Sequence, residues 1–213
     1  MYLPKHFAAP SDQAIDALVR DYPLAQLVTA DAQGQWACNP IPLLARGRLE
    51  AGSTLTGHVA RANPMWQHQG PVLAIFTGPQ AYITPNAYPG KAELHKVVPT
   101  YNYATVQVRG QLVAHDDVDH KLDAVSALTE FAEQTQPEPW SVSDAPAAFV
   151  QANLQAIVAI EIRIESVTAK FKLSQNRNAA DQAGVKEYLS QRAMDDDAAA
   201  MLKLMNTLHN DNK

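Results

Sequence analysis

The chain has 213 residues, a formal net charge of −5 and 46% hydrophobic residues. This composition suits a packed globular protein and excludes a disordered chain, while the acidic balance argues against a generic nucleic-acid binder, which usually carries a basic surplus. Because Cys38 is the only cysteine and no window approaches the ~20 apolar residues of a membrane helix, we expect a soluble, cytoplasmic protein without an intrachain disulfide. The N-terminus also lacks the long apolar stretch of a signal peptide.

The first half of the chain predicts one helix followed by several strands. Ser11 can begin a helix with apolar residues at helical spacing, and Tyr22-Pro23 ends it. We expect Pro40 and Pro42 to push the second strand towards a sheet edge or a bulge, and Gly78-Pro79 to break the fourth. The predicted strands cover residues 24–30, 36–45, 49–57 and 72–76, followed by an extended stretch at 81–84 and a long loop at 85–99.

The second half contains two strands with clear alternation and three helical segments. Alternating apolar residues predict half-buried antiparallel strands, and apolar residues three or four apart predict amphipathic helices. The first helix begins at Asp116 or Asp117, a short one follows Pro146, and the last is at the C-terminus. The C-terminal stripe can cover its own barrel or pair with a second copy. The residues expected to be buried are Val106, Val108, Leu112 and Ala114; Val158, Ile160, Ile162 and Ile164; Val118, Leu122, Val125, Leu128 and Ala132; and Met194, Ala198, Met201, Met205 and Leu208.

The common catalytic signatures are missing, since the sequence has no GxGxxG, Walker, GxSxG or HExxH motif. Residues 115–120, with the sequence His-Asp-Asp-Val-Asp-His, have the composition of a metal site. Acidic residues also gather at helix N-termini, where they complement the exposed N–H groups. We favour this capping role, assign no metal, and identify no catalytic residue.

Three segments carry candidate binding residues. His58, Arg61 and Asn63 lie in a turn after a strand, where Arg61 can hold a phosphate or where the turn can be purely structural. Residues 82–103 hold four tyrosines with Lys91, Thr100 and Asn102, which suit a flat heteroaromatic ligand or an interface. Residues 170–177 follow a strand and hold Lys172, Gln175 and Asn176, which form part of a site unless Ser174 or Asn176 caps the next helix.

Six ordered blocks of the sequence resemble the PaiB family, described as negative transcriptional regulators with an FMN-binding split barrel. The chain departs from that pattern at Asn39, where the family commonly has His, and at Ala87 and Tyr101, where tryptophan is common. The blocks are residues 1–7, 57–64, 76–83, 96–103, 139–142 and 172–177.

The resemblance implies a mainly β, α+β fold: an antiparallel FMN-binding split β-barrel over residues 1–178, followed by a C-terminal helical appendage over residues 179–213. It also implies a homodimer with FMN at its interface, and it assigns the phosphate to His58 and Arg61. From the three candidate segments we also expect Asn63, Lys91, Thr100, Asn102, Lys172, Gln175 and Asn176 to bind the cofactor.

The resemblance leads us to expect a regulatory flavin-binding protein. Direct DNA contact finds no support in the charge or in a helix-turn-helix pattern. Two alternatives stay open. One is a flavin-dependent oxidoreductase, such as a flavin reductase or a pyridoxamine phosphate oxidase-like enzyme, and the other is a flavin-free interaction module.

Overall fold

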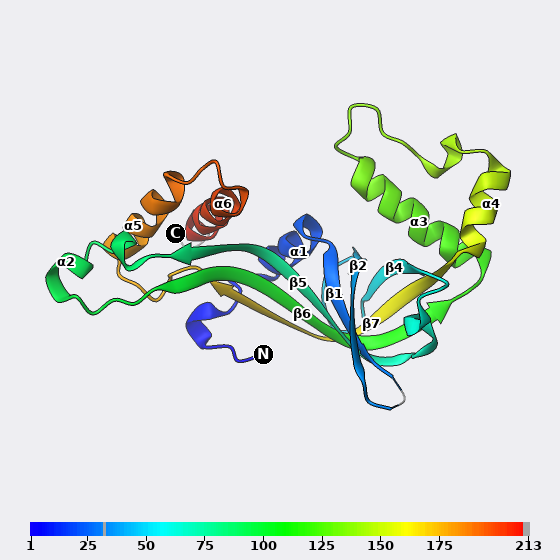
Figure 1. Ribbon diagram of the computed structural model, residues 1–213, viewed down its shortest axis with the longest axis horizontal. Coiled ribbons are helices and arrows are strands. Elements are labelled where there is room, and N and C mark those ends of the chain that lie inside the picture. The colour runs from blue at the N-terminus through cyan, green and yellow to red at the C-terminus, as the bar shows by residue number, and fades with distance from the viewer. Residues whose placement is uncertain (32, 211–213) are drawn as a thin grey trace. The chain divides into compact units, whose positions relative to one another are not determined.

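The computed structural model describes residues 1–31 and 33–210 and shows a curled antiparallel sheet with helices (Figure 1). Within these residues seven strands form one sheet in the order β2-β1-β5-β6-β7-β4-β3. The strands are β1 Leu24–Ala30, β2 Trp36–Pro42, β3 Leu44–Arg46, β4 Thr54–Ala60, β5 Gly70–Ile83, β6 Thr100–His115 and β7 Ile157–Lys172. The predicted α+β fold, mainly β and antiparallel, is confirmed.

Most of the α-helices lie at the start of the chain, between β6 and β7, and after β7, while the short α2 lies between β5 and β6. None of those in the described ranges is both long and apolar enough to cross a bilayer. The α-helices are α1 Asp12–Asp21, α2 Lys91–Leu94, α3 Val118–Glu133, α4 Ala147–Gln155, α5 Ala179–Ser190 and α6 Asp196–Asn210, and the 3₁₀ turns are η1 Lys5–Phe7, η2 Pro64–Gln67, η3 Pro85–Ala87 and η4 Val142–Asp144.

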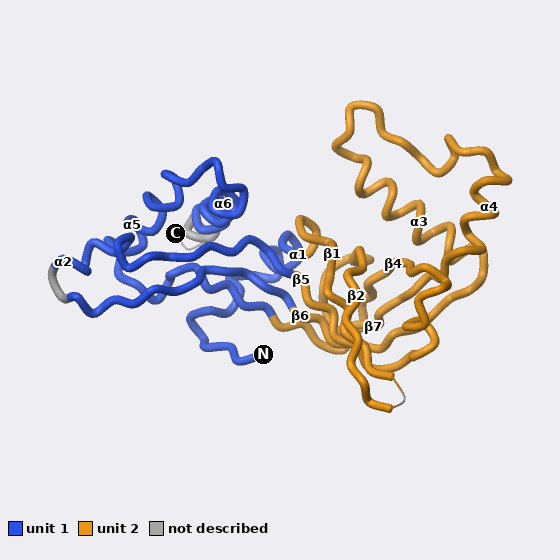
Figure 2. Tube along the Cα trace, viewed as in Figure 1, with its two compact units in different colours: residues 1–18, 77–106, 169–213 blue, residues 19–76, 107–168 orange. Residues whose placement is uncertain are grey.

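The chain divides into two compact units (Figure 2). Unit 1 comprises residues 1–18, 77–106 and 169–213, and it contains α5 and α6 with parts of β5, β6 and β7. Unit 2 comprises residues 19–76 and 107–168, and it contains β1 to β4 with α3 and α4. The predicted division into a barrel domain and a C-terminal appendage at residue 178 stays a prediction.

In unit 2 the sheet curls far enough for strands at its opposite ends to meet. Leu43 links β2 to β3 and is completely buried, and β2 contacts β4 as well as its partner β1. Gly57 of β4 lies so close to β2 that a Cβ atom there would be 2.7 Å from the Pro42 carbonyl oxygen. A glycine is therefore required where the two strands approach. This closure without a continuous hydrogen-bonded ring is the split barrel that the sequence predicted.

The two strands with the clearest alternation form as expected, although Ala114 of β6 is only half-buried. Val106, Val108 and Leu112 of β6 are at most 1% exposed, and the four predicted residues of β7 are at most 3% exposed. Pro40 and Pro42 lie in β2, which is an edge strand. A proline is tolerated there because its missing N–H faces no neighbouring strand.

Three strand predictions in the first half are wrong. The strand predicted at 36–45 is divided at Leu43 into β2, which pairs with β1, and β3, which pairs with β4. β5 continues through Gly78-Pro79 to Ile83, and its buried parity shifts there from even-numbered to odd-numbered residues. An extra residue at that point has the signature of a β-bulge, which accommodates a proline without ending the strand. The strand predicted at 49–57 instead begins at Thr54, because residues 50–53 form a turn that has Gly52 at φ 92°.

The predicted buried face of α3 is wrong in part, since Val125 and Leu128 are half-buried but Ala132 is exposed. Val118 and Leu122 are exposed, whereas Lys121 and Ala124 are buried against the sheet. Helical spacing alone does not determine which of two neighbouring faces of the helix contacts the core, because the aliphatic part of Lys121 can be buried as the side chain of Leu122 can. The helix begins as predicted, because Asp117 is its N-cap and accepts the backbone N–H of His120.

The C-terminal stripe covers its own chain in unit 1. Ala198, Met201 and Met205 are at most 1% exposed, and α6 packs against α5 (Figure 1). Met194 is fully exposed and lies outside the helix, while the side chain of Leu208 lies outside the described residues. The stripe therefore packs within the protomer rather than on a second copy.

Candidate functional site

In unit 2, the predicted anion-binding turn follows β4, and its Arg61 side chain forms hydrogen bonds with neighbouring segments. The Arg61 guanidinium donates from Nε to the Gln155 carbonyl oxygen at 2.7 Å and from Nη1 to Asp116 Oδ2 at 2.9 Å. Its Nη2 also pairs with the second Asp116 oxygen and reaches the Ile157 carbonyl oxygen at 3.3 Å. All three guanidinium nitrogens are therefore engaged within the chain, and a phosphate on Arg61 would have to share or displace Asp116.

Asp116 also pairs with Lys121, whose Nζ lies 2.6 Å from Asp116 Oδ1. Hydrogen bonds from Arg61, and secondly from Lys121, hold the pKa of the Asp116 carboxyl well below its usual range. The Lys121 side chain is 2% exposed, so Asp116 is the counter-ion that this buried ammonium requires. The Arg61–Asp116–Lys121 cluster thus joins the turn after β4 to the start of α3.

His58 and Asn63 complete the unit 2 group. Burial lowers the pKa of the His58 imidazole, and its buried Nδ1 has no hydrogen-bond partner among the described residues. Asn63 caps η2 by accepting the Met65 N–H and donates to Asn39 Oδ1 at 3.1 Å. Asn39 is one of the positions that depart from the PaiB pattern, and it contacts the predicted site directly.

Unit 1 brings together the predicted residues of β6 and β7. Lys172 Nζ hydrogen-bonds Thr100 Oγ1 and donates to the Tyr101 carbonyl oxygen at 2.5 Å. Burial, and secondly the charges of Lys170 and Arg177, lower the pKa of Lys172. Its two hydrogen bonds go to neutral oxygens, so they do not compensate the positive charge.

Lys170 and Arg177 make Lys172 part of a cationic cluster. Lys170 Nζ lies within 6 Å of the ring centroids of Tyr2, Phe7 and Tyr103, and Arg177 lies 4.8 Å from the ring centroid of Tyr88. None of the ion pairs found in residues 1–31 and 33–210 includes Lys170, Lys172 or Arg177. Aromatic faces stabilise such cations only in part, so the cluster is suited to an anion.

The turn after β7 has a strained backbone that two buried side chains hold. Ser174 has φ 63°, an uncommon value for a residue with a side chain, and is 4% exposed. Its hydroxyl donates to Asn102 Oδ1 at 3.1 Å, and Asn102 itself is 0% exposed. Gln175 braces the same turn by accepting the Leu173 N–H at 2.6 Å and donating to the Phe171 carbonyl oxygen.

The remaining predicted residues of unit 1 lie nearer α5. Lys91 donates to Asn86 Oδ1 at 2.5 Å, and the structure replaces part of the predicted 85–99 loop with η3 and α2. Asn176 is exposed, and neither it nor Ser174 caps α5, because Asn178 does so by accepting the Asp181 N–H. That capping alternative is therefore wrong, although Gln182 of α5 donates to the Arg177 carbonyl oxygen at 2.7 Å.

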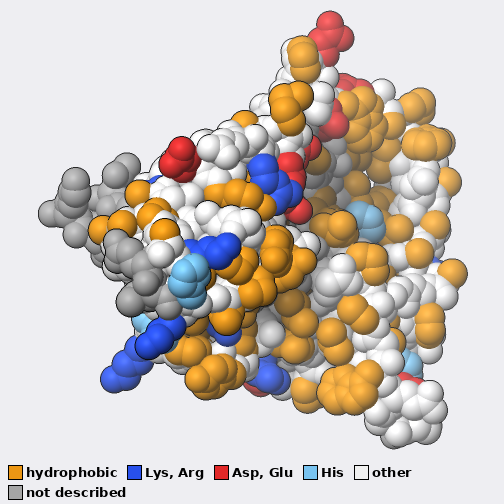
Figure 3. Space-filling view, turned by 60° about the vertical axis from the view of Figure 1, so that its left-hand side comes forward, with side chains coloured by type: hydrophobic (Ala, Val, Ile, Leu, Met, Phe, Trp, Pro, Cys, Tyr) orange, Lys and Arg blue, Asp and Glu red, His pale blue; other side chains and the backbone are white. Residues whose placement is uncertain are grey.

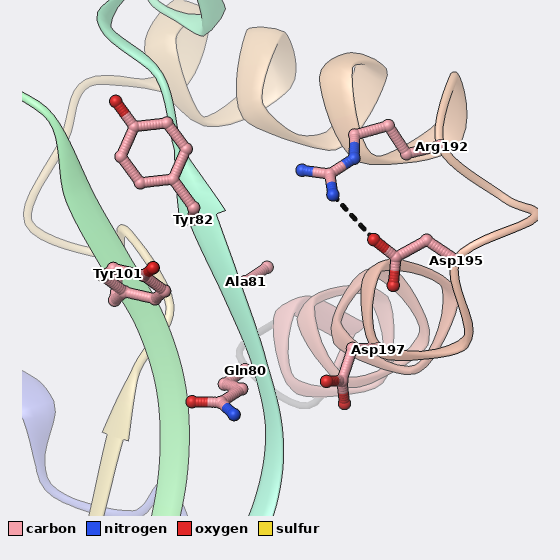
Figure 4. Close-up of a pocket in the computed structure, with 7 residues that line it drawn as sticks. All are labelled: Gln80, Ala81, Tyr82, Tyr101, Arg192, Asp195 and Asp197. Atoms are coloured by element: carbon pink, nitrogen blue, oxygen red, sulfur yellow. Dashed lines mark hydrogen bonds and ion pairs between the residues drawn. The ribbon is translucent and has the colours of Figure 1, made fainter.

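A cavity of about 500 Å³ in unit 1 lies beside two tyrosines (Figure 4). Tyr82 of β5 and Tyr101 of β6 meet edge to face with ring centroids 5.7 Å apart, and both are more than 40% exposed. The opposite side comes from the connection between α5 and α6, where Arg192 pairs with Asp195 at 2.6 Å. The lining residues are Gln80, Ala81, Tyr82, Tyr101, Arg192, Asp195 and Asp197.

Sequence reasoning missed several of these residues. Lys170 and Arg177 flank the predicted Lys172 in the same segment, and their charges were the available signal. Arg192, Asp195 and Asp197 had none, because nothing in a polar helix–helix connection indicates that it will face a distant strand pair. The predicted site residues fall into two groups, with His58, Arg61 and Asn63 in unit 2 and the other six in unit 1.

Comparison with known proteins agrees with this architecture. Residues 1–166 match the family described as "Putative FMN-binding domain". The chain is 30% identical to the protease synthase and sporulation protein PAI 2 of Bacillus subtilis over 96% of both proteins, and 31% identical to an uncharacterized protein of Aspergillus fumigatus over 88% of this chain and 90% of that one.

Among solved structures, the FAD and heme binding protein from Mycobacterium smegmatis has a similar fold. The TM-score is 0.58 at 18% identity, with 82% of this chain and 78% of the other covered. The fold, the match over residues 1–166 and the similarity to PAI 2 together establish that the chain belongs to the FMN-binding domain family and is a PaiB homologue, as the six sequence blocks predicted.

Proposed function

We propose that this protein binds FMN, with the phosphate at the cationic cluster of Lys170, Lys172 and Arg177. The observation that carries the proposal is the half-buried Lys172 ammonium, which lies close to two other cations and is hydrogen-bonded only to neutral oxygens. A dianionic phosphate relieves this repulsion and accepts charge-assisted hydrogen bonds. In a protein of net charge −5, such a local positive cluster selects an anion.

The cavity beside Tyr82 and Tyr101 supports a site for the flavin ring. Its volume of about 500 Å³ lies in the range of small-molecule pockets, and two exposed tyrosines offer aromatic faces to a planar ring. Tyr101 belongs to both features, since its side chain lines the cavity and its carbonyl oxygen accepts the Lys172 hydrogen bond. The residues present therefore fit a flavin phosphate.

The group in unit 2 stays a candidate through the resemblance. His58 has an unpaired buried Nδ1, and Arg61 and Asn63 frame the turn beside it. A flavin supplies hydride and electron transfer when bound, while the protein binds and orients it. We assign no catalytic acid or base. The oxidoreductase alternative therefore relies on the chemistry of the flavin itself, and it requires an electron donor such as a reduced nicotinamide.

Freshly purified protein is expected to show visible flavin absorbance, and the ligand extracted from it is expected to have the mass of FMN. Protein stripped of flavin should gain thermal stability when FMN is added, because a ligand that binds only the folded state raises its Tm. Absence of both signals would exclude flavin binding and favour an interaction module. Anaerobic bleaching by a reduced nicotinamide would instead favour the oxidoreductase.

We further propose a cytoplasmic protein with a regulatory role of the PaiB type. The exposed Cys38 thiol, which forms no disulfide, suits a reducing compartment. The acidic net charge does not favour non-specific contact with DNA. Regulation is therefore proposed to act through the bound flavin or a protein partner rather than through a basic surface.

The protein is also expected to be a homodimer. Tyr2, Tyr82, Val98 and Tyr101 of unit 1 are 42–83% exposed, and Figure 3 shows hydrophobic side chains gathered among lysines and arginines on one face. Exposed aromatic clusters of this kind commonly lie in interfaces. Light scattering should give twice the chain mass of 23.2 kDa, and dilution that separates the protomers should release flavin in parallel. A monomer that holds flavin at full affinity would disprove the shared site.

A further inference from the structure

We propose that unit 2 carries a binding site for a divalent transition metal ion, formed by His115, Asp117 and His120. His115 ends β6, Asp117 is the N-cap of α3, and His120 lies in the first turn of that helix. One ligand atom of each side chain lies within 4.8 Å of those of the other two. The strand end and the helix start thus bring two imidazoles and one carboxylate to one point.

The two imidazoles are stacked against each other, and one ring has to turn for both nitrogen lone pairs to point at a single ion. Their ring centroids lie 4.1 Å apart and their planes differ by 6°. His115 Nε2 is buried without a hydrogen-bond partner in the described part of the chain. A buried ring nitrogen without a partner is costly, and a metal ion coordinated by neutral imidazole removes that cost.

Asp117 fixes the orientation of the second ring. Both of its carboxylate oxygens lie 2.8 Å from His120 Nδ1, which leaves Nε2 of that ring available to a metal. A carboxylate that holds a ligating histidine in this way raises the metal affinity, and its remaining lone pairs leave Asp117 able to bind the ion as well. The capping role of Asp117 is compatible with this one, because the backbone N–H of His120 uses only Oδ1.

A cavity of about 260 Å³ gives an ion and its water molecules access to the two histidines. Asp123 and Glu161 also line it and are held by Arg46 and by Arg163. Glu161 lines the same cavity as His120, and its carboxylate favours a cation there. Coordination positions beyond the protein ligands are then filled by water.

Two imidazoles with a carboxylate select the class of metal. Nitrogen donors suit Zn²⁺, Co²⁺, Ni²⁺ and Cu²⁺, whereas Mg²⁺ and Ca²⁺ require sites built from oxygen. This site is independent of the flavin, because none of its ligands belongs to the proposed flavin-binding residues. Loss of one therefore leaves the other measurable.

The test is titration of untagged, metal-free protein with Co²⁺, followed by optical absorbance, and with Zn²⁺, followed by calorimetry. We expect one ion per chain and a rise in Tm on binding. His115→Gln and His120→Gln should each weaken binding at least about tenfold, since each removes a nitrogen ligand. Asp117→Asn keeps a good N-cap residue and should weaken binding by about 10- to 100-fold.

His6→Gln is the matched control, because His6 is an exposed histidine of unit 1. It should bind the metal as the wild type does. Melting curves without metal show whether each variant is folded. Wild-type protein that binds no stoichiometric ion, or a folded His115→Gln variant with unchanged affinity, overturns the proposal.

Discussion

Replacing Lys172 with alanine is expected to weaken FMN binding by about 10- to 150-fold and to change riboflavin binding far less. A charge-assisted hydrogen bond to phosphate contributes on the order of 1.5–3 kcal/mol, which corresponds to this range of affinity. Riboflavin lacks the phosphate, so it reports the losses that come only from changes in the fold. Fluorescence titration with both ligands measures the difference.

Lys172 is a better residue than Arg61 for this test, because a phosphate can bind it without displacing a counter-ion. Its ammonium is only part-buried and bonds Thr100 and the Tyr101 carbonyl oxygen, which can remain partners while a phosphate binds. Lys172→Met keeps the aliphatic packing and should show the same selective loss. Lys203→Ala, which removes an exposed lysine of α6, is the control and should change neither affinity. Equal losses of FMN and riboflavin would contradict the phosphate assignment.

Arg61→Ala tests the other predicted phosphate ligand in the same titration. If Arg61 binds phosphate, FMN affinity falls and riboflavin affinity does not. If Arg61 serves mainly to hold Asp116 and the carbonyl oxygens of Gln155 and Ile157, both affinities change together and the Tm falls. Comparison of Lys172→Ala with Arg61→Ala thus distinguishes a lysine that has no counter-ion among the residues that the structure describes from an arginine that is already paired with Asp116.

The parts of the fold that could be predicted from the sequence are those where burial follows the local pattern of apolar and polar residues. The alternation in β6 and β7 leaves one apolar face, and burial of that face determines the strand. β1 was predicted with its observed bounds, 24–30, because a proline precedes it and a turn follows it. The start of α3 was predicted to within one residue, at Asp116 or Asp117, because a cap acts through backbone groups three residues away.

The wrong predictions concern features that depend on contacts between segments far apart in the sequence. Lys121 is buried because Asp116 and Arg61 provide its counter-ion network, which spans residues 61–121 and leaves no trace in the α3 pattern. β5 crosses Gly78-Pro79 because a shift of parity accommodates the proline. The cavity residue Arg192 faces Tyr82 only after α5 and α6 have packed.

Replacing Asn102 with aspartate is expected to destabilise the protein at neutral pH and to leave it nearly unchanged in acid. Asn102 is 0% exposed, and its amide bonds the Ser174 hydroxyl and Met205 Sδ. The variant carboxyl has nearly the shape of the amide but must either ionise without a counter-ion or stay protonated. Burial of a carboxyl without a counter-ion raises its pKa by up to about 3–5 units.

The sign of the pH dependence follows from that raised pKa. Below about pH 4 the carboxyl is protonated in both the folded and the unfolded chain, so Asn102→Asp should have close to wild-type stability. As the pH rises, the unfolded chain loses the proton first, so the free energy of unfolding falls until the folded carboxyl also ionises. At 1.36 kcal/mol per pKa unit, the loss at pH 7 is about 4 kcal/mol.

Urea unfolding between pH 4 and pH 8 measures this loss. Asn176→Asp makes the same chemical change at an exposed position two residues beyond Ser174, so its stability should follow the wild type at every pH. Because Asn102 holds the Ser174 turn that leads from Lys172, flavin affinity should fall together with stability as the pH rises. An Asn102→Asp variant as stable as the wild type at pH 7 would mean that water or a counter-ion reaches this side chain, and that the turn after β7 is not held by a dry, buried amide.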